Sequence, residues 1–470
     1  MDEPEKSLKE RLREAMIACR ESVFPAYASP AEVFDGLAEA CRELGIEEWD
    51  VYAERGPVAR LEAEVADLLG RPAAYFPSGV MAQQVALRIH ADNAGNRRVA
   101  MPDLSHLLVY EDDGPRILQD LRIEHLTTGR ETPTKAHLDA IPGPLAACLV
   151  ELPLRDAGCI LPTFDELAEL AQGCRERGIA LHIDGARIWE SQQWFGKPLA
   201  EIAGLADTVY TSFYKGLGGL AGAALLGDDD FVAQARLWRH RMGGTHFRST
   251  AEAVSALVGL RDRLPHIGEC VTWARALAAA LPPSVTVQPP VPHTNTFLMY
   301  AAGDSDAVNT RLLAALEEHS LAFSRPWKAS DEPGRVVTEV TVGQGALELD
   351  AEIVAGHIAA LVGSRLSRER RSKRLHGHTA GDIFGRTSEV LLKGSLMSVQ
   401  FEVRIDGMTC SRCVESVTNA LGDLDGVHGV EVDLNPGATS SARVTADEPV
   451  EPRVLRSTLA KAGFTIARDT

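Results

Sequence analysis

The chain of 470 residues contains no uninterrupted apolar run of about 18 residues, the length that a membrane-spanning helix requires. Its first residues mix Glu, Lys and Arg with short apolar steps, so they lack the continuous apolar centre of a secretory signal. Together these absences predict a soluble, cytoplasmic protein with no membrane partner.

Positive charge is also scarce. Lys and Arg number 48 against 66 Asp and Glu, which gives a formal net charge of -18. Because nucleic-acid affinity comes largely from Lys and Arg that neutralise phosphates, this balance argues against a nucleic-acid partner. It still permits a small anionic substrate held by local cations. The 45% hydrophobic and 24% charged content is that of a globular chain with two or three domains.

Paired cysteines are rare. The spacing of six of the eight cysteines predicts buried or half-buried free thiols in a reducing compartment; these six are Cys19, Cys41, Cys148, Cys159, Cys174 and Cys270. Cys410 and Cys413 differ, because they form a CxxC within Gly407-Met408-Thr409-Cys410-Ser411-Arg412-Cys413.

The hydrophobic pattern alternates between strands and helices through the first half of the chain. Strands are predicted at 146–152, 180–183, 208–213 and 221–226, with helices such as 58–69 and 164–177 between them. This order is typical of an α/β fold with a mostly parallel sheet covered on both faces. Ligand groups should then gather beyond the carboxyl ends of the strands.

Composition divides the chain further. We expect an N-terminal helical segment at 1–48, a large domain at 49–270, a smaller α+β domain at 271–364, a linker at 365–398 and a final module at 399–470. The linker opens with crowded Arg and Lys, which favours a solvated, flexible tether over a contact with nucleic acid or with an anionic surface. The final module shows the β-α-β-β-α-β order of a ferredoxin-like fold.

Two residues carry the chemistry of the large domain. Lys215 lies on a Gly-flanked turn, and Asp184 ends an apolar strand. An amine in such a turn can form a Schiff base with an aldehyde, and a carboxylate can hold a protonated pyridine nitrogen. This pair is the recurring protein partner of pyridoxal phosphate, so the sequence predicts that cofactor.

Residues from about Trp49 to Leu361 resemble the threonine aldolase and β-eliminating lyase group of fold-type-I pyridoxal-phosphate enzymes. Four blocks in the right order carry the resemblance: Phe76-Pro77-Ser78-Gly79-Val80-Met81-Ala82, Leu104-Ser105-His106, His182-Ile183-Asp184-Gly185-Ala186-Arg187-Ile188 and Ser212-Phe213-Tyr214-Lys215-Gly216-Leu217. The Ser78-Gly79-Val80 turn opens a predicted helix, whose free N–H groups and dipole can hold the cofactor phosphate.

The resemblance implies roles for three more residues. His106 would stack on the pyridine ring and act as a base, and Arg187 would reach the substrate carboxylate or the ring oxygen. Arg248 follows a Gly-rich run and would contact the phosphate of a neighbouring subunit, so the resemblance implies a homodimer or homotetramer. A structural His and an ordinary Arg ion pair are the alternatives to these roles.

The sequence departs from the family pattern at three places. Phe24-Pro25-Ala26-Tyr27-Ala28-Ser29 stands where an Arg-Ser-Asp-Thr run is usual, and Glu151-Leu152-Pro153-Leu154-Arg155 stands where Glu-x-Thr-His is usual. Val337-Thr338-Glu339-Val340-Thr341 occupies the region of the Arg that clamps the substrate carboxylate. We therefore consider Arg155 as a replacement cation for the substrate.

The resemblance implies aldol cleavage of a β-hydroxy-α-amino acid such as threonine to glycine and an aldehyde. With the substrate clamp altered, two alternatives stay open. One is another pyridoxal-phosphate reaction, β-elimination or transamination. The other is a metal-binding or regulatory protein whose pyridoxal-phosphate fold is catalytically degenerate.

The CxxC module, from about Val399 to Arg468, resembles the heavy-metal-associated domain of copper chaperones and metal-transporting ATPases. The Met408-Thr409 pair before Cys410 and the strand order carry this resemblance. Thiolates select soft metals, so Cu(I) or another soft ion at Cys410 and Cys413 is expected, with a metal-trafficking protein as a partner. A thioredoxin-type redox pair and a structural pair are the alternatives.

We predict that Cys410→Ser lowers the affinity of the protein for Cu(I) at least tenfold, because one of two thiolate ligands is lost. Competitive titration of the purified protein with a Cu(I) chelator measures this affinity. Cys41→Ser is the matched control and should leave it unchanged. Undiminished affinity in Cys410→Ser would remove the metal assignment.

Overall fold

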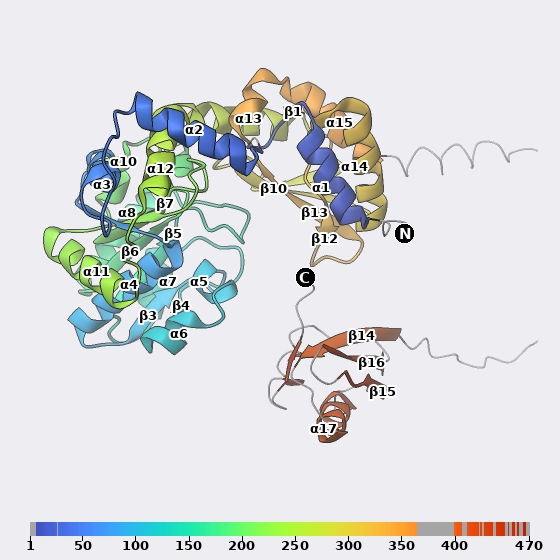
Figure 1. Ribbon diagram of the computed structural model, residues 1–470. Helices are drawn as coiled ribbons and strands as arrows, with labels where there is room; N and C mark the ends of the chain where they lie inside the picture. Colours follow the sequence, from blue (N-terminus) through green and yellow to red (C-terminus); the bar gives the residue numbers. More distant parts are fainter. Residues whose placement is uncertain are drawn as a thin grey trace, which may run out of the picture. The chain divides into compact units, whose positions relative to one another are not determined.

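The computed structural model describes residues 6–25, 27–363, 399–406, 411–422, 424, 427–435, 439–446, 450, 454–455, 458–459 and 464–466. It divides into two compact units, Met1–Gly377 and His378–Thr470 (Figure 1). The basic linker predicted at 365–398 lies outside the described residues. Among the described residues, no helix is both long and apolar enough to cross a membrane.

A seven-stranded sheet forms the centre of the large domain, in the order β2-β8-β7-β6-β5-β3-β4. The pairs among β3 to β7 are parallel, whereas β8 runs antiparallel to both β2 and β7. This arrangement confirms the expected mostly parallel sheet. Its strands are β2 (Ala73–Phe76), β3 (Arg98–Met101), β4 (Arg122–His125), β5 (Ala147–Glu151), β6 (Ala180–Gly185), β7 (Thr208–Ser212) and β8 (Ala223–Leu226).

Helices cover both faces of this sheet, which explains why its central strands are apolar throughout. Along β5, Cys148 and Val150 pack into one core cluster, while Ala147 and Leu149 pack into another on the opposite face. The first cluster includes residues of α3 (Gly56–Leu69) and α8 (Phe164–Glu176), and the second includes residues of α4 (Gly79–Ala94).

The large domain contains several further helices, most of them short. They are α5 (His106–Val109), α6 (Gly114–Gln119), α7 (Lys135–Ala140), α9 (Ile188–Phe195), α10 (Leu199–Ala203), α11 (Asp229–Arg241) and α12 (Thr250–Asp262). Helix α2 (Pro30–Glu43) packs against α12 and begins at a capping box in which Ser29 and Glu32 satisfy each other's backbone N–H groups.

The small domain is built on an antiparallel sheet in the order β12-β13-β10-β9. Its strands are β9 (Val285–Gln288), β10 (Thr296–Ala302), β12 (Lys328–Ala329) and β13 (Arg335–Thr341). Its helices are α13 (Ile267–Ala280), α14 (Ser305–His319) and α15 (Ala351–Gly363), and short 3-10 helices span Leu264–His266 and Gln344–Glu348.

The N-terminal segment shares the core of the small domain. Helix α1 (Leu8–Ala18) packs against α14, as Figure 1 shows, and Leu12, Val23 and Phe24 belong to the same buried cluster as the small-domain strands. Strand β1 (Glu21–Ser22) pairs in parallel with β11 (Leu321–Ala322). The first residues therefore complete a domain whose other elements lie far along the chain.

The second unit contains an antiparallel sheet in the order β15-β16-β14-β17, with α17 (Ser411–Gly422) following β14. Its strands are β14 (Val399–Asp406), β15 (Val427–Asp433), β16 (Ser440–Ala446) and β17 (Thr465–Ile466). The order agrees with the ferredoxin-like module expected from the sequence. Cys410 lies outside the described residues, and Cys413 belongs to α17 without a described side chain.

Candidate active site

The predicted site residues meet where the parallel strands end. Strand β5 ends at Glu151, β6 carries Asp184 next to its end, and the turn after β7 carries Lys215. In the pairing of β5 with β6, Glu151 lies opposite Asp184. The cavity at this edge of the sheet is lined by Val80, Gln83, His106, Glu151, Pro153, Arg155, Asp184, Ala186, Arg187, Tyr210, Tyr214 and Lys215.

Lys215 is held by a tight turn. Gly218 N donates to the carbonyl of Lys215 at 3.0 Å, and Ser212 Oγ donates to the carbonyl of Ala186 at 2.8 Å, which ties the turn to the end of β6. Burial and the neighbouring Arg187 guanidinium lower the pKa of the Lys215 ammonium. A lowered pKa makes more of the amine available as a nucleophile.

Asp184 and Glu151 form a buried pair of carboxyl groups. Asp184 Oδ1 accepts from the N–H of Ala186 at 3.0 Å, and Glu151 Oε1 accepts from the N–H of His106 at 2.6 Å. Burial, and then the charge of Asp184, raise the pKa of Glu151 to about 8. Glu151 is therefore mostly protonated at neutral pH and can donate a hydrogen bond, a role that the sequence did not predict.

His106 opens the short helix α5 and lines the cavity. Its Nδ1 lies 3.1 Å from Glu111 Oε1, and its ring contacts that of Tyr110 with the centroids 5.1 Å apart. Burial, followed by the Lys215 charge, lowers the pKa of His106, so the imidazole is neutral at pH 7. With Nδ1 donating to Glu111, Nε2 is the nitrogen left to accept a proton.

The start of α4 suits a phosphate. Ser78 is the N-cap residue, but its side chain makes no capping hydrogen bond, so the first N–H groups of this 16-residue helix have no side-chain acceptor there. Gly79 fits only without a side chain, because a Cβ would lie 2.1 Å from the Tyr210 hydroxyl oxygen. Together with the Lys215 amine and the Asp184 carboxylate, this helix start fits the expected pyridoxal phosphate.

Arg187 is the free cation of the site. It is the N-cap residue of α9 and lines the cavity. Among the residues that the structure describes, no carboxylate lies within ion-pair distance of its guanidinium. Arg187 is thus ready to receive the carboxylate of a substrate.

Arg155 lines the same cavity, but its charge is already engaged. Its Nη2 lies 2.8 Å from Glu339 Oε2, and its Nη1 lies 3.3 Å from Asp156 Oδ1. The structure therefore brings Arg155 to the site, as expected, and gives it two carboxylate partners that the sequence alone did not reveal.

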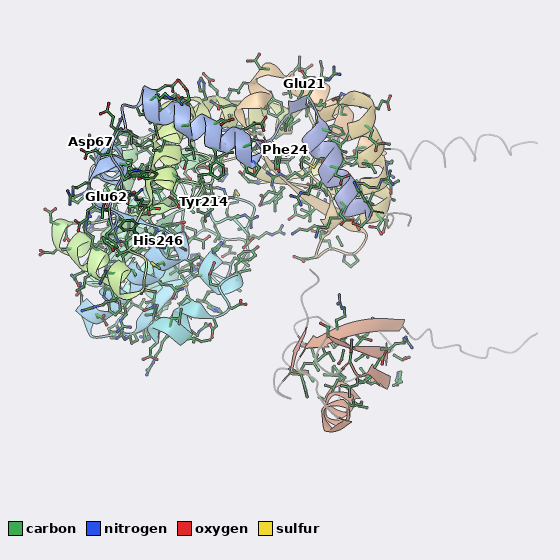
Figure 2. The ribbon with its side chains drawn as sticks, viewed as in Figure 1. Glu21, Phe24, Glu62, Asp67, Tyr214 and His246 are labelled. Atoms are coloured by element: carbon green, nitrogen blue, oxygen red, sulfur yellow. The ribbon has the colours of Figure 1, made fainter. Side chains whose placement is uncertain are left out.

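Arg248 does not line this cavity. Its side chain is exposed, with the guanidinium carbon 4.3 Å from the ring centroid of Trp49 and 5.2 Å from that of Phe247. The loop before it carries His246, which Figure 2 labels on the large domain. The role of Arg248 in a neighbouring subunit's site stays a prediction.

Sequence reasoning missed Glu190. This carboxyl is 1% exposed, and its Oε2 has no hydrogen-bond partner among the described residues. A Cβ on Gly216, the residue after Lys215, would lie 2.2 Å from Glu190 Oε1, so the two are in direct contact. Burial raises the pKa of Glu190. Its place three residues after Arg187, in the first turn of α9, was the only signal in the sequence.

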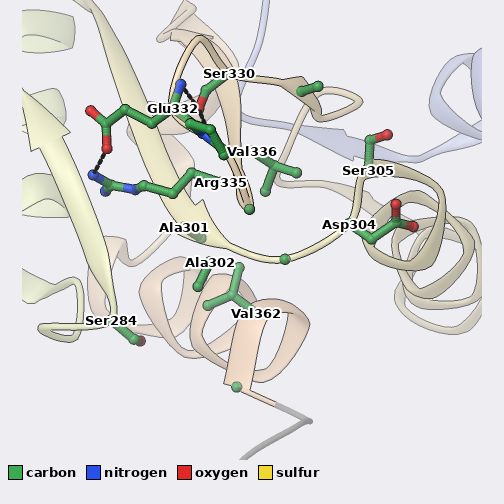
Figure 3. A pocket seen from close by; sticks show the side chains of 15 residues that line it. Ser284, Ala301, Ala302, Asp304, Ser305, Ser330, Glu332, Arg335, Val336 and Val362 are labelled. Carbon is green, nitrogen blue, oxygen red and sulfur yellow. Dashed lines mark hydrogen bonds and ion pairs between the residues drawn. The ribbon is translucent and has the colours of Figure 1, made fainter. Parts of the chain in front are cut away.

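Another cavity lies in the small domain, between the end of β10, the β12–β13 connection and the end of α15 (Figure 3). Its charged groups include Arg335 and Glu332, which form an ion pair at 2.8 Å. None of the residues predicted for catalysis lines it, so the chemistry belongs to the cavity around Lys215.

Comparisons with known proteins agree with this geometry. Residues 37–304 match the beta-eliminating lyase family, and residues 402–465 match the heavy-metal-associated domain. The chain is 30% identical over 246 residues to a probable low-specificity L-threonine aldolase 2 of Arabidopsis thaliana, a match that covers 49% of this chain and 68% of that protein. It is 27% identical over 308 residues to the low-specificity L-threonine aldolase 1 of the same plant, with 62% and 84% covered.

Two solved structures are similar over most of the first unit. A putative L-allo-threonine aldolase from Listeria monocytogenes is 34% identical with a TM-score of 0.71, covering 76% of this chain and all of that one (100%). A putative aromatic amino acid beta-eliminating lyase/threonine aldolase from Exiguobacterium is 36% identical with a TM-score of 0.70, covering 75% and 99%.

We predict that Gly79→Ala weakens pyridoxal-phosphate binding at least tenfold, because the added methyl group collides with the Tyr210 hydroxyl and displaces the helix start. Absorbance titration of the apoprotein measures the dissociation constant. Gly356→Ala is the control, since a Cβ there meets no atom within 4 Å. Unaltered binding in Gly79→Ala would show that this turn does not contact the cofactor.

Glu151 should make the apoprotein less stable as pH rises. Between about pH 4.5 and 8 the folded state holds a proton on Glu151 that the unfolded state has lost, so unfolding becomes easier with increasing pH until the folded pKa is passed. The melting temperature of Glu151→Gln should therefore fall less between pH 5 and pH 9 than that of the wild type. The difference should be roughly in proportion to the shift of the Glu151 pKa. The exposed Glu169→Gln is the control, and an identical pH profile in Glu151→Gln would contradict the shift.

Proposed function

The chain belongs to the beta-eliminating lyase family and is a pyridoxal-phosphate-dependent lyase, and on this premise we propose that it cleaves β-hydroxy-α-amino acids such as threonine to glycine and an aldehyde. The observation that carries the proposal is the meeting of Lys215, Asp184, a neutral His106 and an unpaired Arg187 in one cavity. The names of the relatives, L-threonine aldolases, support the choice of substrate.

The cofactor would be held by three parts of the large domain. Lys215 Nζ is the amine for its aldehyde, Asp184 is the carboxylate for its ring nitrogen, and the N–H groups at the start of α4 are the donors for its phosphate. When bound, pyridoxal phosphate supplies a sink for the electron pair of the broken bond.

The residues of the chain then orient the substrate and move protons. Arg187 holds the substrate carboxylate by paired N–H donors. His106 Nε2 accepts the proton of the β-hydroxyl group, because its Nδ1 is engaged with Glu111 and its lowered pKa keeps the imidazole neutral. Lys215, whose pKa is also lowered, gives up its proton more readily than an ordinary lysine.

A second candidate is β-elimination after loss of the Cα proton. It is favoured by the similarity to the Exiguobacterium protein, which is described as a putative aromatic amino acid beta-eliminating lyase/threonine aldolase. The orientation of the substrate on Arg187 would decide between the two reactions. A degenerate fold is disfavoured, because the cofactor residues Lys215 and Asp184 are both present in the cavity.

We further propose a homodimer or homotetramer in which Arg248 reaches the cofactor phosphate of a neighbouring subunit. Its exposed position on the Trp49 and Phe247 rings supports this, because Arg248 does not line the cavity of its own chain. For the second unit we propose a soft metal, Cu(I), at Cys410 and Cys413, supported by the match to the heavy-metal-associated domain, with a metal-trafficking protein as its partner.

We predict that the purified protein forms glycine and acetaldehyde from threonine, and that Lys215→Ala abolishes this activity together with the visible absorbance of the cofactor. Chromatographic detection of glycine and a coupled assay for acetaldehyde measure the products. Lys197→Ala, a surface lysine paired with Glu201, is the control and should retain full activity. Detection of a keto acid in place of glycine would show that the reaction is elimination or transamination and not aldol cleavage.

A further inference from the structure

A cluster of charged side chains surrounds Arg155, one of the residues that line the cavity around Lys215. Arg155 lines the cavity, and its Nη2 lies 2.8 Å from Glu339 Oε2. Arg325 Nη1 lies 4.0 Å from the other oxygen of Glu339, so this carboxylate sits between two guanidinium groups. Asp156 Oδ1 lies 3.3 Å from Arg155 Nη1 and accepts a hydrogen bond from the Tyr110 hydroxyl at 2.9 Å.

The members of this cluster come from different domains. Arg155 and Asp156 follow β5 of the large domain, whereas Glu339 belongs to β13 of the small domain. Along β13, Val336 and Val340 face the small-domain core, and Glu339, which alternates with them, faces the opposite way. Glu339 thus extends from one domain to a cation on the other.

The charges leave one cation for a ligand. Arg155, Arg187 and Arg325 each carry a positive charge, and Glu339 and Asp156 each carry a negative charge. Both carboxylates contact Arg155, and no described carboxylate lies within ion-pair distance of Arg187. Of the two arginines that line the cavity, Arg155 and Arg187, only Arg187 can therefore accept a carboxylate without displacing a described group of the protein.

We propose that Glu339 is a specificity-determining residue, whose carboxylate fills the cation site between Arg155 and Arg325 and so disfavours amino acids with an acidic side chain. The inference rests on the proposed function to the extent that an amino acid binds at this cavity. A substrate with an acidic side chain that reaches Arg155 in the cavity would have to replace Glu339 in a charge-assisted hydrogen bond to this guanidinium.

Aspartate and asparagine provide the test, since they differ in one charge and hardly in shape. Their dissociation constants for the holoenzyme are measured from changes in cofactor absorbance, without reference to turnover. Glu339→Gln should lower the ratio of the aspartate constant to the asparagine constant at least tenfold, because Arg155 and Arg325 become available to the second carboxylate. Glu332→Gln, which breaks the surface ion pair with Arg335 next to β13, should leave the ratio unchanged.

Two further variants keep the test decisive. Arg155→Met added to Glu339→Gln should reverse most of the gain, since the unmasked cation is removed. Asp156→Asn, which frees Arg155 from its other carboxylate, should lower the ratio about threefold even if Glu339→Gln fails to fold. An unchanged ratio in folded Glu339→Gln, or in Asp156→Asn where Glu339→Gln does not fold, would overturn the proposal. Failure of the protein to form glycine from threonine would contradict the proposed aldol cleavage, but it would not contradict the proposed role of Glu339.

Discussion

Two carboxyl groups lie at adjacent strand ends in a buried site, and the active site depends on the repulsion between them. Glu151 lies opposite Asp184 in the β5–β6 pair, and its pKa rises to about 8. The proton that Glu151 holds at neutral pH lowers the negative charge at these strand ends. Lys215 and Arg187 line the same cavity, and Arg187, which has no carboxylate within ion-pair distance among the described residues, gives the cavity its attraction for anions.

Much of this site is local in sequence and could be predicted. Lys215, Asp184 and the Ser78-Gly79 turn each lie in a short motif whose backbone conformation places the functional group at a strand end or a helix start. The central strands were also predicted, because a sheet covered on both faces requires continuous apolar runs. The mostly parallel sheet and the ferredoxin-like order of the second unit follow from the same patterns.

The remainder depends on contacts between residues far apart in the chain, which no local pattern encodes. The partnership of Arg155 with Glu339 joins two domains, and the contact of Glu190 with Gly216 requires the folded turn after β7. The raised pKa of Glu151 reflects a strand register as well as burial. The N-terminal segment could not be assigned to the small domain, because its partner α14 begins at Ser305.

The pairing of β1 with β11 bears on how this protein is made. During synthesis, α1 leaves the ribosome long before α14 has been translated. Until then, the apolar side chains of Leu12 and Phe24 lack the residues that bury them in the folded protein. The seven-stranded sheet between them can fold earlier as a unit. The N-terminal segment therefore stays uncovered until the small domain has been translated. A holdase chaperone would bind it during this period.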